Sequence, residues 1–286
     1  MSDAVVLGHT GFIGRRLLDE LRRRGADAVG HASATVDLRR AESLQALDGT
    51  VSPATSVFFA SALTPDRGAT LDSLSANMAM VVNVARYLEA HPVRVCVYVS
   101  SDAVYPMTAA AVTEESPVEP AAFYALAKYT GERVLQRLVE TKSLRLVVLR
   151  VTGVYGPGDT HGSYGPNLFV KSIAKERVLR MFGGGEETRD HVYVDDVARL
   201  AVDLASSEQS GVFNVATGES RTFASIADDL RAVVPDAFKV ESLPRRAPIT
   251  HRRFDVTRLR EALPKLRFTP FRDGLAAAWA AASSRS

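Results

Sequence analysis

The sequence AVVLGHTGFIG, residues 4–14, joins a short apolar strand to an amphipathic helix through three glycines. The strand covers residues 4–8, and the helix that follows ends at Gly25. Glycines allow a tight turn and let the backbone approach a diphosphate, while the helix N-terminus supplies free N–H groups. In this context the turn predicts a dinucleotide site. Its residues are Gly8, Thr10, Gly11, Phe12, Ile13 and Gly14.

The same alternation of strand and helix continues through the first half of the chain. We expect further strands at residues 27–33, 56–60, 93–101 and 144–151, with helices at about 71–90 and 122–140. Strands that are apolar throughout and separated by helices indicate a parallel sheet covered on both faces. The expected fold class is therefore α/β, a Rossmann-type doubly wound parallel sheet.

Glycine and proline cluster after residue 153, and the regular alternation is lost. We therefore expect residues 1–155 to form a dinucleotide-binding domain. Residues 156–286 would form mainly a small C-terminal substrate-binding lobe laid over one edge of the sheet, with some segments returning to the first domain.

Composition limits the class of protein. The 286 residues are 46% hydrophobic and 24% charged, and 35 basic against 33 acidic residues give a net charge of +2. This balance argues against nucleic acid or an anionic membrane as the main partner. The single cysteine, Cys96, excludes an internal disulfide, and the six histidines lack metal-ligand spacing, so no metal is expected. We find no signal peptide and no apolar run of membrane-spanning length, and expect a cytoplasmic protein.

A candidate catalytic group is formed by Ser101, Tyr124 and Lys128. Tyr124 and Lys128 lie four positions apart in an expected helix and therefore on the same face. A nearby ammonium and a positive nicotinamide ring would stabilise the Tyr124 phenolate and make it a proton donor or acceptor near neutral pH. Ser101 ends the expected strand at 93–101, and ligands bind at the carboxyl ends of strands in open α/β sheets.

Together these motifs resemble the extended short-chain dehydrogenase/reductase family, which contains nucleotide-sugar epimerases, dehydratases and ketoreductases. The resemblance rests on the glycine spacing of residues 8–14, on SSDAVY at 100–105 and on the Tyr124–Lys128 pair. It continues through RVTGVYGPGD at 150–159, TRDHVYVDDVA at 188–198 and FTPFRDGL near residue 270, and so covers essentially the whole chain.

The resemblance implies a role for each matching residue. Tyr124 would transfer the proton, Lys128 would lower its pKa and hold the nicotinamide ribose, and Ser101 would orient the reacting oxygen. Further cofactor contacts would come from Asp37 and Leu38 at the adenine, from Ala60, Ser61 and Ala62 beneath the cofactor, and from Asn77 behind the lysine. Asn167 and Arg189 would hold the substrate diphosphate. Gly153 stands where the family has an asparagine that contacts the sugar or phosphate of the substrate. Tyr155 and Tyr164 are the candidates to supply that contact instead.

Three departures from the family pattern affect the expected reaction. Asp102 is followed by Ala103, whereas sugar dehydratases carry an acid pair there; Asp102 remains a candidate acid, but dehydration is disfavoured. Ala32 and Ser33 occupy the place of the acid that binds the ribose of NAD, which favours NADPH over NAD. His31, Ser33 and Arg39 are near enough to receive a 2′-phosphate. We expect Arg252 and Arg253 to be an exposed, solvated pair rather than phosphate ligands.

The leading hypothesis is NAD(P)-dependent hydride transfer that reduces the 4-keto group of a nucleotide-activated deoxy-sugar. A nucleotide-sugar 4-epimerase with retained NAD is the alternative, because it would use the same residues. A non-catalytic dinucleotide-binding or sensing protein, and an enzyme for a small carbonyl substrate without a nucleotide, are two further alternatives. The resemblance also implies a homodimer, through a four-helix bundle built from the helices at 77–90 and 122–140.

Overall fold

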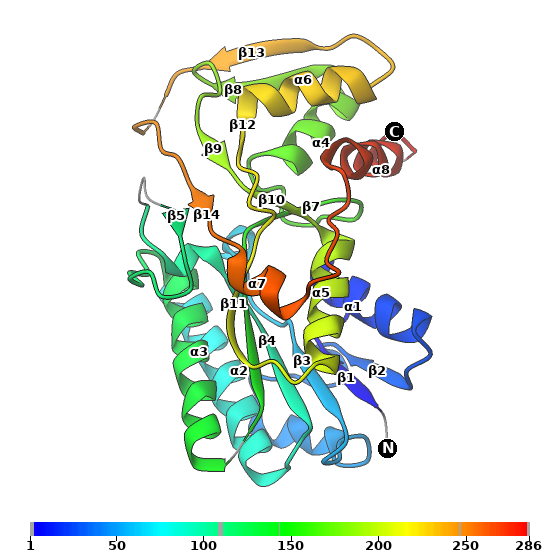
Figure 1. Cartoon of the computed structure of the whole chain (residues 1–286), viewed down its shortest axis with the longest axis vertical. Coiled ribbons are helices and arrows are strands. Elements are labelled where there is room, and N and C mark those ends of the chain that lie inside the picture. The colour runs from blue at the N-terminus through cyan, green and yellow to red at the C-terminus, as the bar shows by residue number, and fades with distance from the viewer. Residues whose placement is uncertain (1–2, 108–110, 143, 246, 285–286) are drawn as a thin grey trace.

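The computed structural model describes residues 3–107, 111–142, 144–245 and 247–284. Within these residues the chain folds as an α/β protein around a six-stranded parallel sheet, which confirms the expected Rossmann-type class (Figure 1). In spatial order the strands are β2 (Ala28–His31), β1 (Ala4–Leu7), β3 (Ser56–Phe59), β4 (Val95–Ser101), β6 (Leu146–Val151) and β11 (Gly211–Val215).

The order of the strands reverses beside β1. The chain passes from β1 to β2 on one side and then crosses to β3 on the other side, and β1 pairs in parallel with both. The loops that leave β1 and β3 therefore diverge at the same edge of the sheet. This is the point at which open α/β sheets bind ligands.

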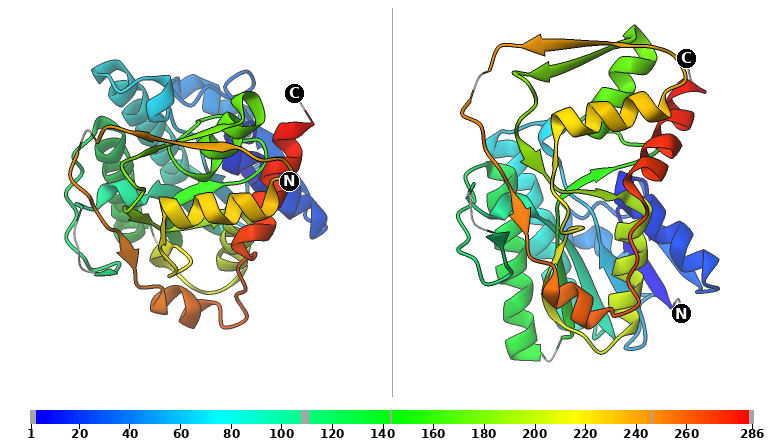
Figure 2. Two further views of the ribbon diagram at one scale, coloured as in Figure 1. Left: turned by 90° about the horizontal axis from the view of Figure 1, so that it is seen from above. Right: turned by 45° about the horizontal axis from the view of Figure 1, so that its top comes forward.

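Helices cover both faces of the sheet (Figure 2). One face packs against α1 (Phe12–Arg23) and α5 (Val194–Ser206), and the other packs against α2 (Leu71–Ala90) and α3 (Phe123–Lys142). Successive strand residues alternate between the two layers, as the geometry of a strand requires. Val97, for example, is buried on the α1 and α5 side, and Tyr98 on the α2 and α3 side.

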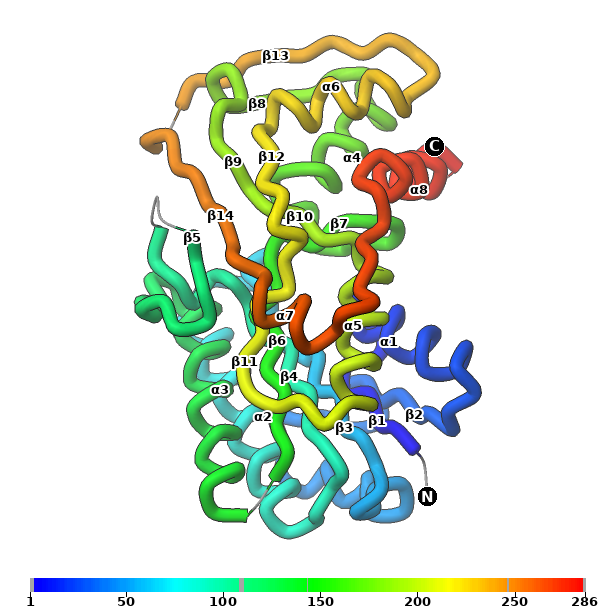
Figure 3. The backbone as a smooth tube through the Cα atoms, viewed as in Figure 1, coloured from blue at the N-terminus to red at the C-terminus, as the bar shows by residue number. Residues whose placement is uncertain are grey.

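The second lobe lies beyond the carboxyl-terminal ends of the strands (Figures 1 and 3). Its core is built from apolar side chains on α4 (Pro166–Glu176), α6 (Phe223–Val233) and α8 (Phe271–Ser283) and on a parallel strand pair. The strands of that pair are β8 (Val178–Phe182) and β13 (Lys239–Leu243). The lobe thus closes over the edge where the loops of the sheet diverge.

Short elements connect the two parts. The two-stranded pairs are β7 (Gly153–Tyr155) with β10 (His191–Tyr193), β9 (Thr188–Arg189) with β12 (Arg221–Thr222), and β14 (Arg253–Phe254) with β5 (Ala111–Val112). The short helices are η1 (Ala41–Leu47), η2 (Pro65–Arg67), η3 (Asp102–Val104) and α7 (Thr257–Ala262). Because β14 pairs with β5, a C-terminal segment reaches the loops that follow β4.

None of the helices in the described part of the chain is long and apolar enough to cross a membrane.

Candidate active site

The glycine-rich turn leads from β1 directly into α1. Gly8 has a φ of +92°, and a Cβ there would lie 2.6 Å from Oγ of Ser61. A Cβ on Gly14 would lie 2.1 Å from the carbonyl oxygen of Gly8. No side chain caps the helix at Gly11, so the first N–H groups of α1 stay available. The turn therefore presents backbone donors and a helix N-terminus without obstruction, which fits the diphosphate of a dinucleotide.

The small residues Ala60, Ser61 and Ala62 leave β3 opposite this turn. The segment is fixed by Asn77 of α2, whose Oδ1 accepts from the Leu63 N–H at 2.7 Å and whose Nδ2 donates to the Leu63 carbonyl at 3.0 Å. Asn77 thus supports the backbone beside the cleft. Lys128, which we expect in front of Asn77, donates to the carbonyl of Val99 at 2.6 Å.

Ser101, Tyr124 and Lys128 meet at one cleft with a volume of about 650 Å³. Ser101 is the last residue of β4, and its Oγ accepts from the Ala103 N–H at 3.1 Å. Tyr124 and Lys128 face the cleft from the first turns of α3, and Nζ of Lys128 lies 5.8 Å from the centre of the Tyr124 ring. Residues 11–14 of the glycine-rich turn line the same cleft.

Burial controls the protonation of this group. It raises the pKa of Tyr124, as do the charges of Asp102 and Asp66, whereas a hydrogen bond with Ser101 lowers it. The expected lowering of the tyrosine pKa by Lys128 and a nicotinamide ring concerns the cofactor-bound protein and stays a prediction. Burial also lowers the pKa of Lys128 to about 8, against the opposing effect of Glu132. In the protein alone the tyrosine is therefore a neutral phenol at pH 7.

A buried ion pair lies behind Lys128. Glu132, one turn further along α3, accepts from Nη2 of Arg150 at 2.7 Å and from Nε at 3.1 Å. Oγ of Ser100 also donates to Glu132, at 2.5 Å, and Nη1 of Arg150 donates to the Tyr105 hydroxyl at 2.8 Å. No motif in the sequence pointed to this pair. An isolated arginine within an otherwise apolar strand was the available signal, because a buried charge requires a partner.

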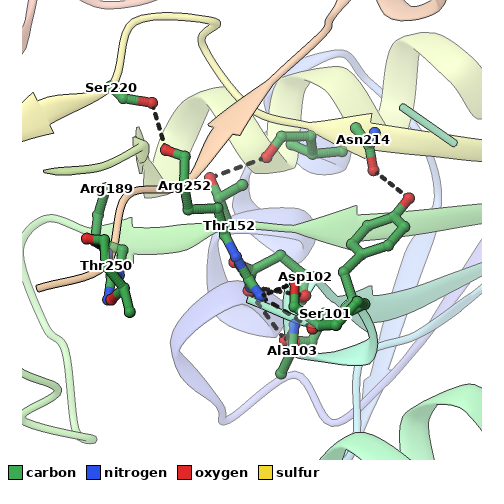
Figure 4. Close-up of polar contacts among 12 residues, drawn as sticks. Ser101, Asp102, Ala103, Thr152, Arg189, Asn214, Ser220, Thr250 and Arg252 are labelled. Atoms are coloured by element: carbon green, nitrogen blue, oxygen red, sulfur yellow. Dashed lines mark hydrogen bonds and ion pairs between the residues drawn. The ribbon is translucent and has the colours of Figure 1, made fainter. Parts of the chain in front are cut away.

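Asp102, the candidate acid, is paired with Arg252 (Figure 4). Nη1 of Arg252 lies 2.9 Å from Oδ2 of Asp102, and only 6% of Arg252 is exposed. The expectation of an exposed arginine pair is therefore wrong for Arg252, although Arg253 is exposed. Burial raises the pKa of Asp102, and the charge and hydrogen bond of Arg252 offset this effect only in part.

A second pocket of about 410 Å³ adjoins the cleft, and Gly153, Tyr164 and His191 line both. Arg189 and Arg252 also line this pocket. Arg189 donates to the Thr250 carbonyl at 2.8 Å and to its hydroxyl at 2.7 Å, and Figure 4 shows the two residues side by side. Asp102, Glu187 and Asp190 line the same pocket, and Arg252 is paired with Asp102, so the pocket carries mixed charge. A molecule that extends from the cleft into this pocket would meet Arg189 there.

Two expected substrate ligands have other partners. Asn167 lines the cleft, but its Oδ1 accepts from the Gly156 N–H at 3.0 Å and its Nδ2 donates to the Val154 carbonyl at 3.1 Å. Its amide therefore fixes the backbone of that turn. Tyr155 lies outside the cleft, because its ring is buried in the core of the second lobe and its hydroxyl donates to the Phe271 carbonyl. We correct its assignment from substrate contact to packing residue.

The end of β2 has the expected character. The strand ends at His31, so Ala32 and Ser33 stand at its carboxyl end and no carboxylate is present there. Asp37 accepts from Nη2 of Arg39 at 2.7 Å. The Leu38 side chain is buried in the core and its carbonyl accepts from Asn83, so its expected contact with adenine is not available to that side chain.

Among the residues that the structure describes, no group of three His, Cys, Asp or Glu side chains is arranged to hold a metal ion.

Comparison with known proteins places this geometry in a family. Residues 4–216 match the model of the NAD dependent epimerase/dehydratase family. A UDP-glucose 4-epimerase of Mycolicibacterium smegmatis is 29% identical over 287 residues, which cover 91% of each chain.

Solved structures of similar fold include two that cover nearly all of both chains. One is a UDP-N-acetylglucosamine 4-epimerase from Methanobrevibacter ruminantium in complex with UDP-N-acetylmuramic acid, with a TM-score of 0.88 and 24% identity; the match covers 100% of this chain and 99% of that one. The other is RMD from Pseudomonas aeruginosa complexed with NADPH, with a TM-score of 0.86 and 22% identity over 99% of this chain and 100% of that one. At these identities the two likenesses establish the fold alone.

Proposed function

Since the chain belongs to the NAD-dependent epimerase/dehydratase family, we propose that it transfers hydride at C4 of a nucleotide-activated sugar, as an NADPH-dependent reductase of a 4-keto deoxy-sugar. The observation that carries this proposal is the meeting of Ser101, Tyr124 and Lys128 in a cleft that also contains the glycine-rich turn. Ser101 comes from β4, Tyr124 and Lys128 come from α3, and the glycine-rich turn leads into α1.

The two adjoining cavities support a nucleotide sugar as substrate. A keto-sugar in the main cleft would place its carbonyl at Ser101 and Tyr124. The diphosphate and nucleoside would then extend into the second pocket, past Gly153 and Tyr164, towards Arg189. A small carbonyl substrate without a nucleotide would leave that second pocket unused.

Ser101, Tyr124 and Lys128 each have a separate role in the proton transfer. The Ser101 hydroxyl orients the substrate carbonyl, and the neutral Tyr124 phenol donates a proton to its oxygen as the carbon is reduced. Lys128 places an ammonium beside the resulting phenolate and stabilises it. The nicotinamide cofactor, when bound, supplies the hydride. The backbone of residues 11–14 would hold its diphosphate, and Lys128 would hold its nicotinamide ribose.

The preference for NADPH rests on the end of β2. A carboxylate at Ala32 or Ser33 would repel a 2′-phosphate, and neither residue carries one. Burial and the neighbouring His9 lower the pKa of His31, which disfavours a positive charge on the His31 imidazole at neutral pH. Arg39 lies close in sequence and would have to exchange its partner Asp37 for the phosphate.

A 4-epimerase with retained NAD is the second candidate. One observation favours it: the Mycolicibacterium relative that aligns over 91% of each chain is a UDP-glucose 4-epimerase. Both reactions need the same Ser101, Tyr124 and Lys128. They differ in whether the cofactor leaves after each turnover.

The two candidates are separated by purifying the protein, denaturing it and identifying any released nucleotide by chromatography. The reductase predicts little retained nucleotide, tighter binding of added NADPH than of NADH, and oxidation of NADPH by UDP-linked or dTDP-linked 4-keto-6-deoxy sugars. Stoichiometric release of NAD, together with interconversion of UDP-glucose and UDP-galactose, would establish the epimerase instead. Binding of cofactor with neither activity would favour a non-catalytic sensor.

The homodimer remains a prediction. Helices α2 and α3 pack side by side on one face of the sheet, and Leu71, Phe123 and Leu126 near their N-terminal ends are exposed. Sedimentation equilibrium tests this prediction directly.

A further inference from the structure

Arg252 links the C-terminal lobe to the loop that carries Ser101. Its Nη1 donates to both the carbonyl and the carboxylate of Asp102, each at 2.9 Å. Its Nη2 donates to the carbonyls of Tyr105 at 3.0 Å and Pro106 at 3.1 Å. Figure 4 shows this guanidinium lying against the residues that follow β4. Four hydrogen bonds from one side chain thus hold a turn of five residues.

The position of Arg252 is itself fixed by the lobe. Its N–H donates to the Thr188 carbonyl at 3.1 Å, and its own carbonyl accepts from Oγ of Ser220 at 2.7 Å. The following residues form β14, which pairs with β5. The side chain therefore extends from an anchored backbone, and only 7% of it is exposed.

The Ser101 hydroxyl contacts the turn that Arg252 holds. Oγ of Ser101 accepts from the Ala103 N–H at 3.1 Å and lies 3.5 Å from Oδ1 of Asp102. Asp102 is also the carboxylate nearest in sequence to the reacting centre. Tyr124, Arg189 and Asp190 are the other ionisable groups that interact with it electrostatically.

We propose that Arg252 is a positioning residue: by holding Asp102 and the turn at 102–106, it fixes the Ser101 hydroxyl for its contact with the reacting oxygen. The expected effect on kcat rests on the proposed function, whereas the ordering of the turn at 102–106 by Arg252 does not. Arginine is required because a lysine has the charge but not the planar fork that reaches two groups of acceptors at once.

The pairing also explains why Asp102 is a poor candidate for the acid of a dehydratase. Its Oδ2 is engaged by a buried guanidinium, which stabilises the carboxylate form. Oδ2 of Asp102 is therefore not free to donate a proton to a substrate in this arrangement. Asp102 serves instead as the acceptor through which Arg252 acts.

The first test measures hydrogen–deuterium exchange of the whole protein by mass spectrometry and needs no substrate. In Arg252→Lys we expect exchange of the amides of residues 102–105 to accelerate by about tenfold or more, while peptides of β1 and α1 keep the wild-type rate. Arg253→Lys is the matched control, because this neighbour is exposed and lines neither the cleft nor the second pocket. Unchanged exchange at 102–105 in Arg252→Lys would overturn the proposal, whether or not a substrate is known.

The second test separates positioning from general destabilisation. If wild-type enzyme reduces a 4-keto sugar, Arg252→Lys should lower kcat by about 10-fold to 100-fold, leaving the KM for NADPH and the Tm close to wild type. A loss of cofactor affinity and of Tm together would show a merely structural role and contradict the proposal. Absence of turnover in wild type would contradict the proposed function alone, since the exchange experiment still decides the role of Arg252.

A double-mutant cycle tests whether Arg252 acts through Asp102. If it does, Asp102→Asn combined with Arg252→Lys should reduce kcat no further than the more severe single change. Fully additive losses would show that the two residues act independently, which the proposal forbids.

Discussion

Nζ of Lys128 lies 5.8 Å from the centre of the Tyr124 ring, one turn away on α3, with both side chains facing the cleft. The ammonium is therefore close enough to stabilise a phenolate, while its own hydrogen bond goes to the Val99 carbonyl. This arrangement makes Tyr124 the proton donor of the proposed reaction and Lys128 its electrostatic support.

Replacing Tyr124 with phenylalanine should remove the proton donor without changing the shape of the cleft. We expect kcat to fall by about 10²-fold to 10⁴-fold, with the affinity for NADPH retained. Steady-state kinetics and fluorescence titration of the cofactor measure the two effects. Tyr129→Phe, on the same helix but packed into a separate apolar cluster, is the control and should remain active. Full turnover by Tyr124→Phe would show that another group moves the proton.

The lowered pKa of Lys128 predicts a pH dependence of cofactor binding. Lysine ordinarily titrates well above pH 8, but burial brings this pKa to about 8, so the ammonium loses its proton as the pH rises through that value. We expect the Kd for NADPH to increase by about threefold to tenfold between about pH 7 and about pH 9, because the neutral amine is a weaker partner for the ribose. Titrations of Lys128→Met should show no such step. A constant wild-type Kd over this range would contradict the assignment.

Glu132→Gln should destabilise the fold, because it leaves Arg150 as a buried charge without a full partner. Breaking one side of a buried ion pair costs about 3–5 kcal/mol, and urea unfolding followed by circular dichroism measures it. Replacing both residues, as in Glu132→Leu with Arg150→Met, should restore part of the lost free energy of unfolding. A free energy of unfolding for Glu132→Gln within about 1 kcal/mol of the wild-type value would show that the fold does not depend on this ion pair.

Ala32→Asp should reverse the cofactor preference. A carboxylate at the end of β2 would repel the 2′-phosphate, so we expect NADPH affinity to fall by at least about tenfold while NADH affinity is kept or improved. Ala54→Asp introduces the same charge at an exposed site before β3 and should change neither affinity. Equal weakening of NADH and NADPH by Ala32→Asp would show a steric effect and refute the proposed basis of selectivity.

Local patterns in the sequence were sufficient for the fold and for the centre of the site. The glycine spacing of residues 8–14 and the interval from Tyr124 to Lys128 each lie within one or two elements, and their geometry follows from the helix repeat and from strand-to-helix turns. The sheet order then brings Ser101 beside them, because carboxyl ends of parallel strands share one edge.

The residues that surround this centre could not be predicted in the same way. Arg252 pairs with Asp102 across 150 residues of sequence. Because neighbouring residues say nothing about such a distant partner, the local sequence indicated only a solvated surface charge. Tyr155 was considered for the substrate because of its place beside Gly153, but its burial depends on α8, which arrives from the far end of the chain. Tertiary packing determines whether such side chains are buried or exposed, and the local sequence pattern does not predict that packing.

The most direct test of the account supplies the enzyme with NADPH that carries deuterium at C4 of the nicotinamide, together with a UDP-linked 4-keto-6-deoxy sugar. Mass spectrometry and NMR then locate the label in the product. We predict deuterium at C4 of the reduced sugar with the wild-type enzyme, and transfer that is slower by about 10²-fold or more with Tyr124→Phe. Transfer that proceeds equally in both proteins, or wild-type enzyme that binds the cofactor but labels no nucleotide sugar, would contradict the assignment of this cleft.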